Sequence, residues 1–403
     1  MEIRRNKMFR KKSKALVGMS LIMSALIMVS GCGASKPAAT APGAAESKEP
    51  IKIGFLGAKT GDVAIYGLNT LKGLNMAVEE LNKEGVLGRK VQLVEEDNAG
   101  KKDQAINITN KLISQDKVVA IVGDPTTGIT RVAGQIANSK KTVIISAGST
   151  STDVVEIGSY VFLNTLLDTI AAPATMKYVI QEKGWKNVAL ITLKNNDYSV
   201  SLSKIFSNAI TSNGGKIVIE EFIQDKDTDF SGQITKIKAA NPDVIVFSGY
   251  YTEAALIMKK AREVGIKALM VGGDGLQGDD LMKIGGAAVE GSISYAGFSP
   301  EQPTANTEKF INAYKAKYSN ELPDLFAAQG YDALMLIAKS IKDANSAEAE
   351  KFKDTLAKTK NYDGVSGSIT FQDNREPIKS PVYLLEVKGG KFALLKKVPV
   401  EVK

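Results

Sequence analysis

The chain has 403 residues, of which 44% are hydrophobic and 24% are charged, and its formal net charge is +8 at neutral pH. A chain of this length exceeds one ordinary hydrophobic core, so two domains are expected. Because the sequence contains no histidine, it cannot form a Ser-His-Asp triad or a histidine-ligated zinc site.

The first thirty residues have the pattern of a secretory signal. Seven lysines and arginines between Arg4 and Lys14 precede the apolar stretch "ALVGMSLIMSALIMVS". This stretch is too short for a membrane span, and charged residues flank it on one side only. Removal of residues 1–31, which hold seven basic residues and one glutamate, lowers the net charge from +8 to +2. The remaining basic residues are scattered among acids, so no nucleic-acid partner is expected.

Cys32 is the only cysteine of the chain and follows the apolar stretch directly. The sequence "VSGC" resembles the bacterial lipobox, in which the cysteine is lipidated and becomes the first residue of the mature protein. An inert buried thiol is the alternative for a lone cysteine. The residues after it are rich in Ala, Pro, Gly and Ser, which is typical of a flexible tether. We therefore expect a signal peptide over residues 1–31, and a lipid-anchor cysteine with a tether over residues 32–50.

From Ile51 onward, short β-rich apolar runs alternate with segments of helical period, as in parallel α/β sheets with helices on both faces. The first predicted strands are "IKIGFLGA", "KVQLVEED", "VVAIVGD" and "TVIISAG", with helices near 66–83, 101–116 and 127–139. A second series begins near Asp168, with strands "NVALITL", "KIVIEEFI", "DVIVFSG", "ALMVGGD" and "GSISYAGF" and helices near 199–213, 230–240 and 253–264. Helices near 307–318, 325–343 and 347–358 then precede a strand "GSITF" and a hairpin "PVYLLEVKGGKFALLKKV". The expected fold class is α/β, with two lobes that exchange chain segments.

Small polar residues follow two strands of the first series. "DPTTG" (124–128) and "GSTST" (148–152) offer backbone N–H groups and hydroxyls that can hold a carboxylate next to a helix N-terminus. The alternative is that these residues are only helix N-caps. In the second series, Asp274 follows a strand and can offer a counter-charge to an ammonium group, the alternative being an exposed turn acid. Together the two ends predict a dipolar ligand.

Six stretches between Ile51 and about Val387 resemble the periplasmic leucine/isoleucine/valine-binding protein family, the solute receptors of branched-chain amino-acid ABC transporters. They are "IKIGFLGAKTGDVAIYG", "VVAIVGDPTTGIT", "VIISAGSTST", "YVFLNTLLD", "VFSGYYTEAALIMKKAREVG" and "LMVGGDG". The resemblance implies the type I periplasmic-binding-protein fold, two Rossmann-like lobes joined by a three-strand hinge. The implied lobes are residues 51–168 with 298–376, and residues 169–297 with 377–403.

The resemblance also implies where the carboxylate of a ligand binds. Thr127 and Thr150 are expected to meet it next to Thr126, and Gly148 and Ser149 are expected to offer backbone groups. The chain has Thr127 where relatives commonly have Ser, and Gly148-Ser149 where they commonly have Ala-Ala.

The remaining implied roles concern the ammonium group and the walls of the cleft. The ammonium is expected to meet Asp274, which is shorter by one methylene than the Glu of some relatives, and the backbone near Gly148. The expected wall and hinge residues are Tyr66, Tyr198 and Tyr250 along the cleft, Phe326 in the side-chain pocket and Asp168 at the first crossing between the lobes.

The implied function is that of an extracytoplasmic receptor, lipid-anchored to the bacterial membrane, which captures an aliphatic or branched-chain L-amino acid by hinge closure. Its expected partner is the permease of an ABC transporter, and we expect a monomer without cofactor, metal or catalytic residues. A short-chain amide- or urea-binding receptor, or a sensory receptor, of the same fold is the alternative.

An enzyme is disfavoured, because the sequence has neither a G-x-S-x-G elbow nor a G-x-x-x-x-G-K-[ST] phosphate loop. The stretch "GDGLQG" (273–278) satisfies the dinucleotide pattern G-x-G-x-x-G. The motif comes late in the chain, and the negative charge of Asp274 within it would repel a pyrophosphate, so nucleotide binding is disfavoured.

Overall fold

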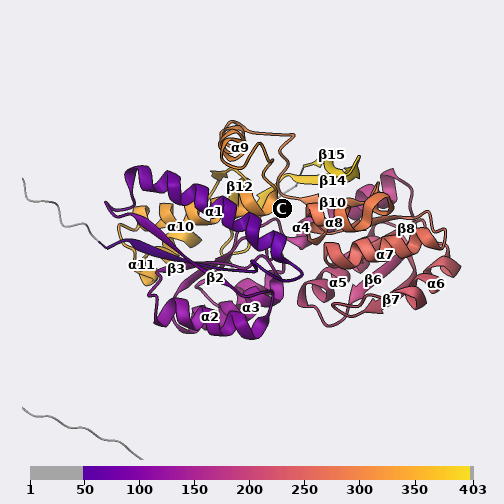
Figure 1. Ribbon diagram of the computed structural model, residues 1–403, viewed down its shortest axis with the longest axis horizontal. Coiled ribbons are helices and arrows are strands. Elements are labelled where there is room, and N and C mark those ends of the chain that lie inside the picture. Colours follow the sequence, from indigo (N-terminus) through magenta and orange to yellow (C-terminus); the bar gives the residue numbers. More distant parts are fainter. Residues whose placement is uncertain (1–48, 400–403) are drawn as a thin grey trace, which may run out of the picture. The chain divides into compact units, whose positions relative to one another are not determined.

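The computed structural model describes residues 49–399. The predicted signal peptide, Cys32 and most of the predicted tether lie outside this range. The described chain forms two α/β halves, each built around a mainly parallel sheet (Figure 1). None of the helices between residues 49 and 399 combines the length and the apolar character needed to span a bilayer.

The first half contains a five-stranded parallel sheet with the strand order β2-β1-β3-β4-β5. Its strands are β1 (Ile51–Gly57), β2 (Val91–Asp97), β3 (Ala120–Gly123), β4 (Val143–Ser146) and β5 (Val161–Leu163). Its first helices are α1 (Ala64–Glu84), α2 (Lys102–Ser114) and α3 (Thr127–Ser139). Side chains such as Leu56 and Ile121 pack under α2 and α3, while Ile53 and Phe55 on the other face pack under α1. Because both faces are covered, the inner strands β1, β3 and β4 are buried almost throughout, whereas the edge strand β2 carries the polar residues "EED" at its end.

The chain returns to the first half after strand β10 (Ile293–Ala296) of the second sheet. It then forms α9 (Ala305–Lys317), α10 (Leu325–Asp343), α11 (Ala349–Ala357) and a three-stranded antiparallel sheet of β11 (Tyr362–Gly364), β12 (Gly367–Phe371) and β13 (Pro377–Ser380). The orange helix α10 lies beside the indigo helix α1 in Figure 1, on the same face of the first sheet. Segments far apart in the sequence therefore build one core.

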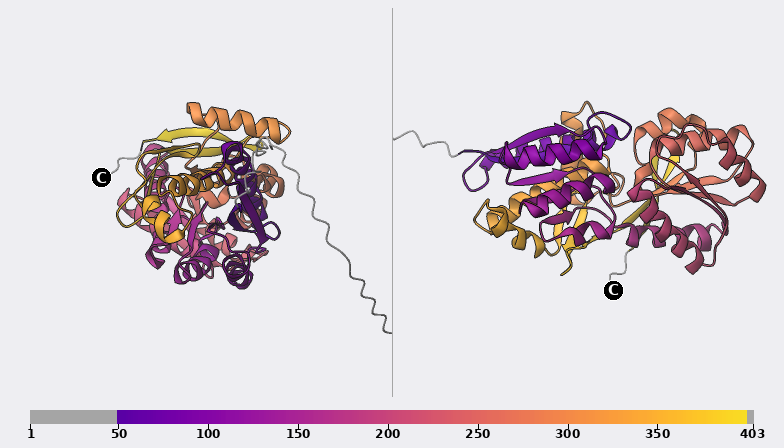
Figure 2. Two further views of the ribbon diagram at one scale, coloured as in Figure 1. Left: turned by 90° about the vertical axis from the view of Figure 1, so that its left-hand side faces the viewer. Right: turned by 90° about the horizontal axis from the view of Figure 1, so that it is seen from below.

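The second half contains a seven-stranded sheet with the order β15-β14-β10-β9-β8-β6-β7. Its strands are β6 (Asn187–Leu193), β7 (Lys216–Ile223), β8 (Val244–Ser248), β9 (Leu269–Gly272), β10 (Ile293–Ala296), β14 (Val382–Lys388) and β15 (Lys391–Val398). Its helices are α4 (Asp168–Lys177), α5 (Asp197–Ser212), α6 (Ser231–Ala240), α7 (Tyr251–Glu263) and α8 (Asp279–Gly285). The final hairpin β14–β15 joins antiparallel to β10, and Figure 2 shows these yellow strands from two further directions.

The structure confirms the predicted fold class and most predicted elements. The helices predicted over 127–139 and 325–343 coincide with α3 and α10, and the predicted C-terminal hairpin is β14–β15. Helix α4 is not predicted from the sequence; it contains Pro173 and small buried residues such as Ala171 and Ala172. With little polar contrast between its faces, such a helix shows no clear 3.6-residue period. Strand β5 was also missed, because it has only three residues.

Two glycines set the contact between α1 and α10. A Cβ on Gly73 would lie 1.9 Å from the carbonyl oxygen of Ala327, and a Cβ on Gly330 would lie 2.5 Å from that of Thr70. The two helix backbones therefore touch, which only glycine permits at these positions. This close contact also places the first turns of both helices side by side.

We predict that Gly73→Ala lowers the free energy of unfolding by about 1–3 kcal/mol, because the added methyl group forces the two helices apart. The matched control is Gly232→Ala in α6, where nothing lies within 4 Å of the added Cβ. That variant should be neutral or slightly more stable, since alanine favours a helix over glycine. Urea unfolding checks both, and equal midpoints for the Gly73→Ala protein and the wild type would contradict the close contact.

Candidate functional site

The N-terminus of α3 lies at one side of the site. The first hydrogen bond of this helix runs from the amide of Thr130 to the carbonyl of Thr126, at 3.0 Å, so the amides of residues 127–129 come before it. The hydroxyl of Thr126 donates to the carboxylate of Asp124 at 2.6 Å and does not cap the helix. Thr126 stands at the N-cap position of α3, but its side chain makes no capping hydrogen bond, so the helix end can accept an anion.

The turn after β4 packs against this helix end. A Cβ on Gly148 would lie 2.5 Å from Cβ of Pro125, so glycine is needed for the two turns to touch. The hydroxyl of Ser149 donates to that of Thr127 at 3.2 Å. The hydroxyl of Thr150 points elsewhere and donates to the carboxylate of Asp168 at 2.7 Å.

The opposite side of the site is built by the second half. Asp274 follows β9 and is only 6% exposed, so it is not the exposed turn acid of the alternative interpretation. The hydroxyl of Tyr198, from α5, donates to the carboxylate of Asp274 at 3.0 Å. The ring of Tyr198 stacks on that of Tyr250 with a centroid distance of 5.4 Å and an interplanar angle of 5°.

A small cavity lies between these two sides. Its lining consists of Tyr66, Pro125, Thr126, Thr127, Gly148, Tyr198, Tyr250, Asp274, Gly275 and Phe326. Its volume of about 20 Å³ is far below the ~300–1,000 Å³ of pockets for drug-sized ligands, so the two sides lie close together here and must move apart to admit a ligand. Of the predicted binding residues, Ser149 and Thr150 do not line the cavity.

Pro125 and Gly275 line the cavity although they were not predicted as binding residues. Both stand in stretches in which the sequence predicts binding residues, "DPTTG" and "GGDG", but the prediction rests there on the neighbouring threonines and on Asp274. A further residue, Tyr295, donates a hydrogen bond to Asp168 behind the site. It lies within strand β10, where an aromatic residue gives no sequence signal beyond that of a core position.

Tyr66 connects the two halves across the cavity. Its hydroxyl, carried by α1 of the first half, donates to the carbonyl of Gly275 in the second half at 2.6 Å. Its ring packs on that of Phe326 with a centroid distance of 4.5 Å. The close crossing of α1 and α10 therefore positions both rings, and they form an apolar wall.

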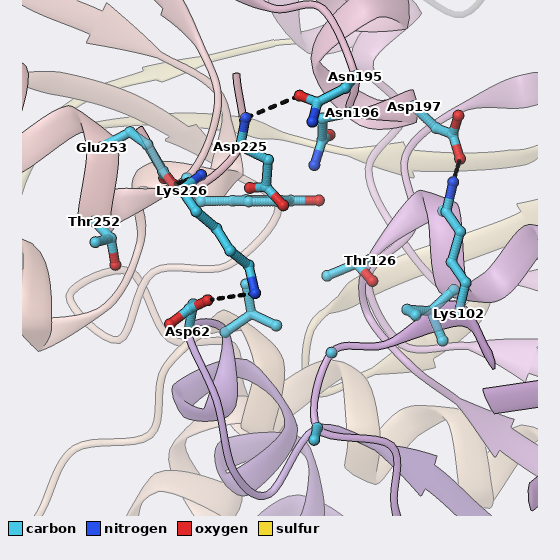
Figure 3. A pocket seen from close by; sticks show the side chains of 16 residues that line it. Asp62, Lys102, Thr126, Asn195, Asn196, Asp197, Asp225, Lys226, Thr252 and Glu253 are labelled. Atoms are coloured by element: carbon cyan, nitrogen blue, oxygen red, sulfur yellow. Dashed lines mark hydrogen bonds and ion pairs between the residues drawn. The ribbon is translucent and has the colours of Figure 1, made fainter. Parts of the chain in front are cut away.

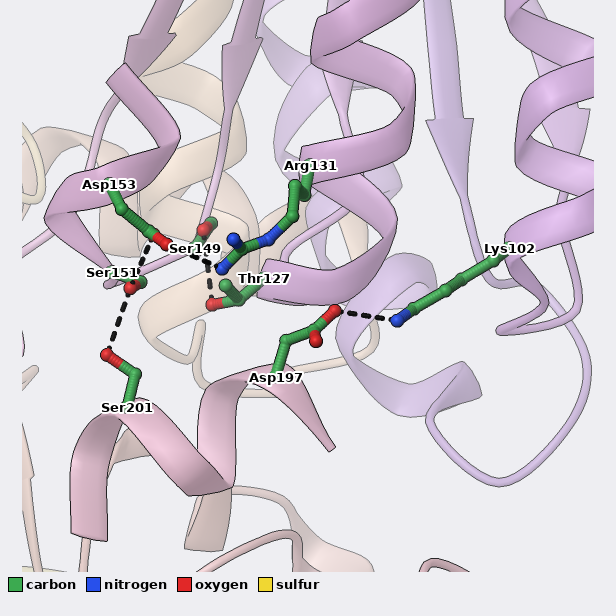
Figure 4. Close-up of polar contacts among 8 residues, drawn as sticks. All are labelled: Lys102, Thr127, Arg131, Ser149, Ser151, Asp153, Asp197 and Ser201. Atoms are coloured by element: carbon green, nitrogen blue, oxygen red, sulfur yellow. Dashed lines mark hydrogen bonds and ion pairs between the residues drawn. The ribbon is translucent and has the colours of Figure 1, made fainter. Parts of the chain in front are cut away.

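A larger recess lies beside the cavity and shares Thr126 and Tyr250 with it (Figure 3). Two ion pairs join the halves here, Lys226 with Asp62 at 3.1 Å and Lys102 with Asp197 at 2.6 Å. Figure 4 shows the second of these pairs, and near it a hydrogen bond of 3.0 Å between the hydroxyls of Ser151 and Ser201.

These contacts show that the two halves are closed on each other in this structure. Exposed ion pairs contribute only about 0.2–1 kcal/mol each, so the pairs at the recess hold the closed arrangement weakly.

Two buried carboxylates dominate the electrostatics of the site. Burial raises the pKa of Asp274 well above its usual range, and the neighbouring charge of Asp168 raises it further. Burial also raises the pKa of Asp168 to about 6, although hydrogen bonds from Tyr295 and Thr150 favour its ionised form. No lysine or arginine lines the described cavity. The site therefore lacks a positive charge, which a ligand can supply.

The described residues include no group of three or more His, Cys, Asp or Glu side chains arranged to hold a metal ion. The cavity combines an anion-accepting helix end, an unpaired carboxylate and aromatic walls. These features serve reversible binding of a small dipolar molecule.

Comparison with known proteins gives a consistent result. A sequence profile of the family described as "Periplasmic binding protein" matches residues 50–391. The leucine-, isoleucine-, valine-, threonine- and alanine-binding protein of Pseudomonas aeruginosa is 29% identical over 328 residues, which cover 81% of this chain and 86% of that protein.

Two solved structures extend this similarity to the fold. The leucine-binding protein LivK of Thermotoga maritima has a TM-score of 0.83 and 33% identity, and the match covers 87% of this chain and 99% of that chain. The branched-chain amino-acid transporter substrate-binding protein LivJ of Streptococcus pneumoniae, in complex with isoleucine, has a TM-score of 0.81 and 34% identity with the same coverage.

Proposed function

The chain belongs to the periplasmic binding protein family, and we propose that it is an extracytoplasmic receptor for an aliphatic or branched-chain L-amino acid. In this proposal it delivers the amino acid to the permease of an ABC transporter, acts as a monomer and catalyses no reaction. The similarity to LivJ, which was solved with isoleucine, supports this ligand class.

The observation that carries the proposal is the buried, unpaired carboxylate of Asp274 opposite the N-terminus of α3. A buried carboxylate needs a positive partner, and an amino acid brings one in its ammonium group. The carboxylate of the same amino acid can accept hydrogen bonds from the amides at the start of α3. The lining thus matches the two charged groups of an amino acid.

The cavity walls support an apolar side chain. The rings of Tyr66 and Phe326 face the space between the two charged ends, and no lysine or arginine lines the described cavity. A charged ligand side chain would have to give up its hydration there without gaining a partner. Leucine, isoleucine, valine and alanine should therefore outcompete lysine, arginine, aspartate and glutamate.

Closure would move the proposed lobe of residues 51–168 and 298–376 against that of residues 169–297 and 377–403. A ligand held by Thr127 on one side and Asp274 on the other favours the closed form, because it contacts both lobes only there. Asp168, at the first crossing, is a hinge residue in this proposal.

A receptor for a short-chain amide or urea, or a sensory receptor, is the second candidate, because the fold alone does not distinguish these functions. A neutral amide, however, leaves Asp274 without a positive partner. The charge of the ligand therefore separates the two candidates.

We predict that Asp274→Asn weakens leucine binding by about 2–5 kcal/mol, because the substitution keeps the shape and removes the partner of the ammonium group. Titration calorimetry with leucine and with a simple aliphatic amide measures this. The control is Asp279→Asn, an exposed acid a few residues away, which should leave the affinity unchanged. Equal leucine affinity of the Asp274→Asn protein and the wild type, or tighter binding of the amide by the wild type, would favour the amide receptor.

We further propose that Cys32 carries a lipid anchor, on the basis of the "VSGC" motif. Cys32→Ser should abolish incorporation of labelled lipid and release the mature protein from the membrane fraction, while leucine affinity stays the same. Fractionation and labelling of cells that express either form would test this. Continued lipid labelling of the Cys32→Ser protein would exclude this residue as the anchor.

A further inference from the structure

Two carboxylates lie buried at this site: Asp274, which lines the cavity and is 6% exposed, and Asp168, which lies behind it and is not exposed. Each accepts a hydrogen bond from a tyrosine, Asp274 from Tyr198 and Asp168 from Tyr295. A Cβ on Gly273 would lie 2.3 Å from the hydroxyl oxygen of Tyr198 and 2.9 Å from that of Tyr295. Both hydroxyls therefore approach the same glycine, and the two carboxylates belong to one buried polar cluster.

The ionisable groups with the largest effects on this cluster are acidic or phenolic. Those that act on the two carboxylates or on the cavity tyrosines are Tyr198, Tyr250, Tyr251, Tyr295, Asp124, Asp225 and Glu253. The remaining contact of Asp168 is the neutral hydroxyl of Thr150. No lysine or arginine lines the described cavity, and the two lysines of the adjoining recess, Lys102 and Lys226, pair with acidic side chains.

Like charges in a shared buried site are difficult to hold together, so one of them tends to keep a proton. Burial and mutual repulsion raise the pKa of Asp274, and burial raises that of Asp168 to about 6. A group whose pKa is raised in this way is ionised only when the pH is high or when a positive charge arrives.

Resting on the proposed amino-acid function, we propose that Asp168 and Asp274 hold one proton between them in the ligand-free protein and release it to solvent when the ammonium group of the ligand binds. Asp274 contacts the ammonium in this scheme. Asp168 does not touch the ligand and is a positioning residue, because its charge sets how readily Asp274 ionises.

The sign of the resulting pH dependence follows from linkage. Below the pH at which the ligand-free pair loses its proton, binding must remove that proton, so affinity is weak. As the pH rises through this range, the removal becomes easier and affinity increases, by up to about 10-fold per pH unit for one full proton. At higher pH the ligand-free pair is already ionised, and the affinity levels off.

The test is titration calorimetry of leucine with the full mature protein between about pH 5 and pH 8, in pairs of buffers with different ionisation heats. We expect the wild type to bind more tightly as the pH rises and to release protons over the pH range in which the ligand-free pair still holds one. Asp168→Asn removes the second charge, so most of this proton release should disappear. Tyr295→Phe keeps both carboxylates but removes a hydrogen bond to ionised Asp168, so the pH dependence should move to higher pH.

The pH profile separates this role from a structural one. If Asp168 served only to hold the fold, its replacement would weaken binding by the same factor at every pH. A wild-type affinity that is constant across the range, with no proton release, would overturn the proposal while leaving the proposed function intact.

Infrared titration of the ligand-free protein tests the proposal without a ligand. A protonated carboxyl band should be present near pH 6 in the wild type, and it should be lost or shifted to lower pH in both Asp168→Asn and Asp274→Asn. Absence of such a band in the wild type would overturn the proposal. Failure of leucine to bind the wild type at any pH would instead contradict the proposed function.

Discussion

The buried carboxyl group of Asp274 is the constraint on which the site depends. It is enclosed by aromatic rings, has a second carboxyl group in its cluster, and has no basic partner among the described residues. Ionising a buried carboxyl group without a positive partner is costly, so its pKa is raised, and a ligand can supply the missing positive group at this position. The preference of the site for a ligand with an ammonium group then follows from electrostatics.

The scaffold makes this arrangement available through simple rules of α/β folds. The carboxyl ends of parallel strands and the N-termini of the following helices meet at one edge of each sheet, so β3 with α3 and β9 with its turn present their groups to a shared crevice. Glycines permit the close approaches, at Gly148 against Pro125 and at Gly73 against α10. The helix end and the carboxylate thus come from different halves, so a ligand held by both groups contacts both halves.

Much of this could be read from the sequence, for identifiable reasons. Strands and helices alternate with clear periods, and polar residues such as Thr127 and Asp274 stand at strand ends, where the fold rules place a ligand. The cleft positions of Tyr66 and Phe326 are predicted only by the resemblance to a family. Each is an aromatic residue near the start of a helix, and the sequence pattern does not distinguish it from a core residue. Local pattern does not show which rings reach across a cleft.

The directions of individual side chains depend on the geometry of the turns that carry them, and no periodic pattern in the sequence predicts these directions. Ser149 and Thr150 stand in the predicted binding stretch, yet their hydroxyls bind Thr127 and Asp168 and do not line the cavity. Tyr295 lies in a buried strand, so its hydrogen bond to Asp168 could be found only in the structure. The most direct measurement of the central claim is a crystal structure of the protein with leucine. The account predicts the ammonium nitrogen within hydrogen-bond distance of the Asp274 carboxylate and the ligand carboxylate at the N-terminus of α3, whereas a ligand in the reverse orientation, or one that leaves Asp274 unpaired, would contradict it.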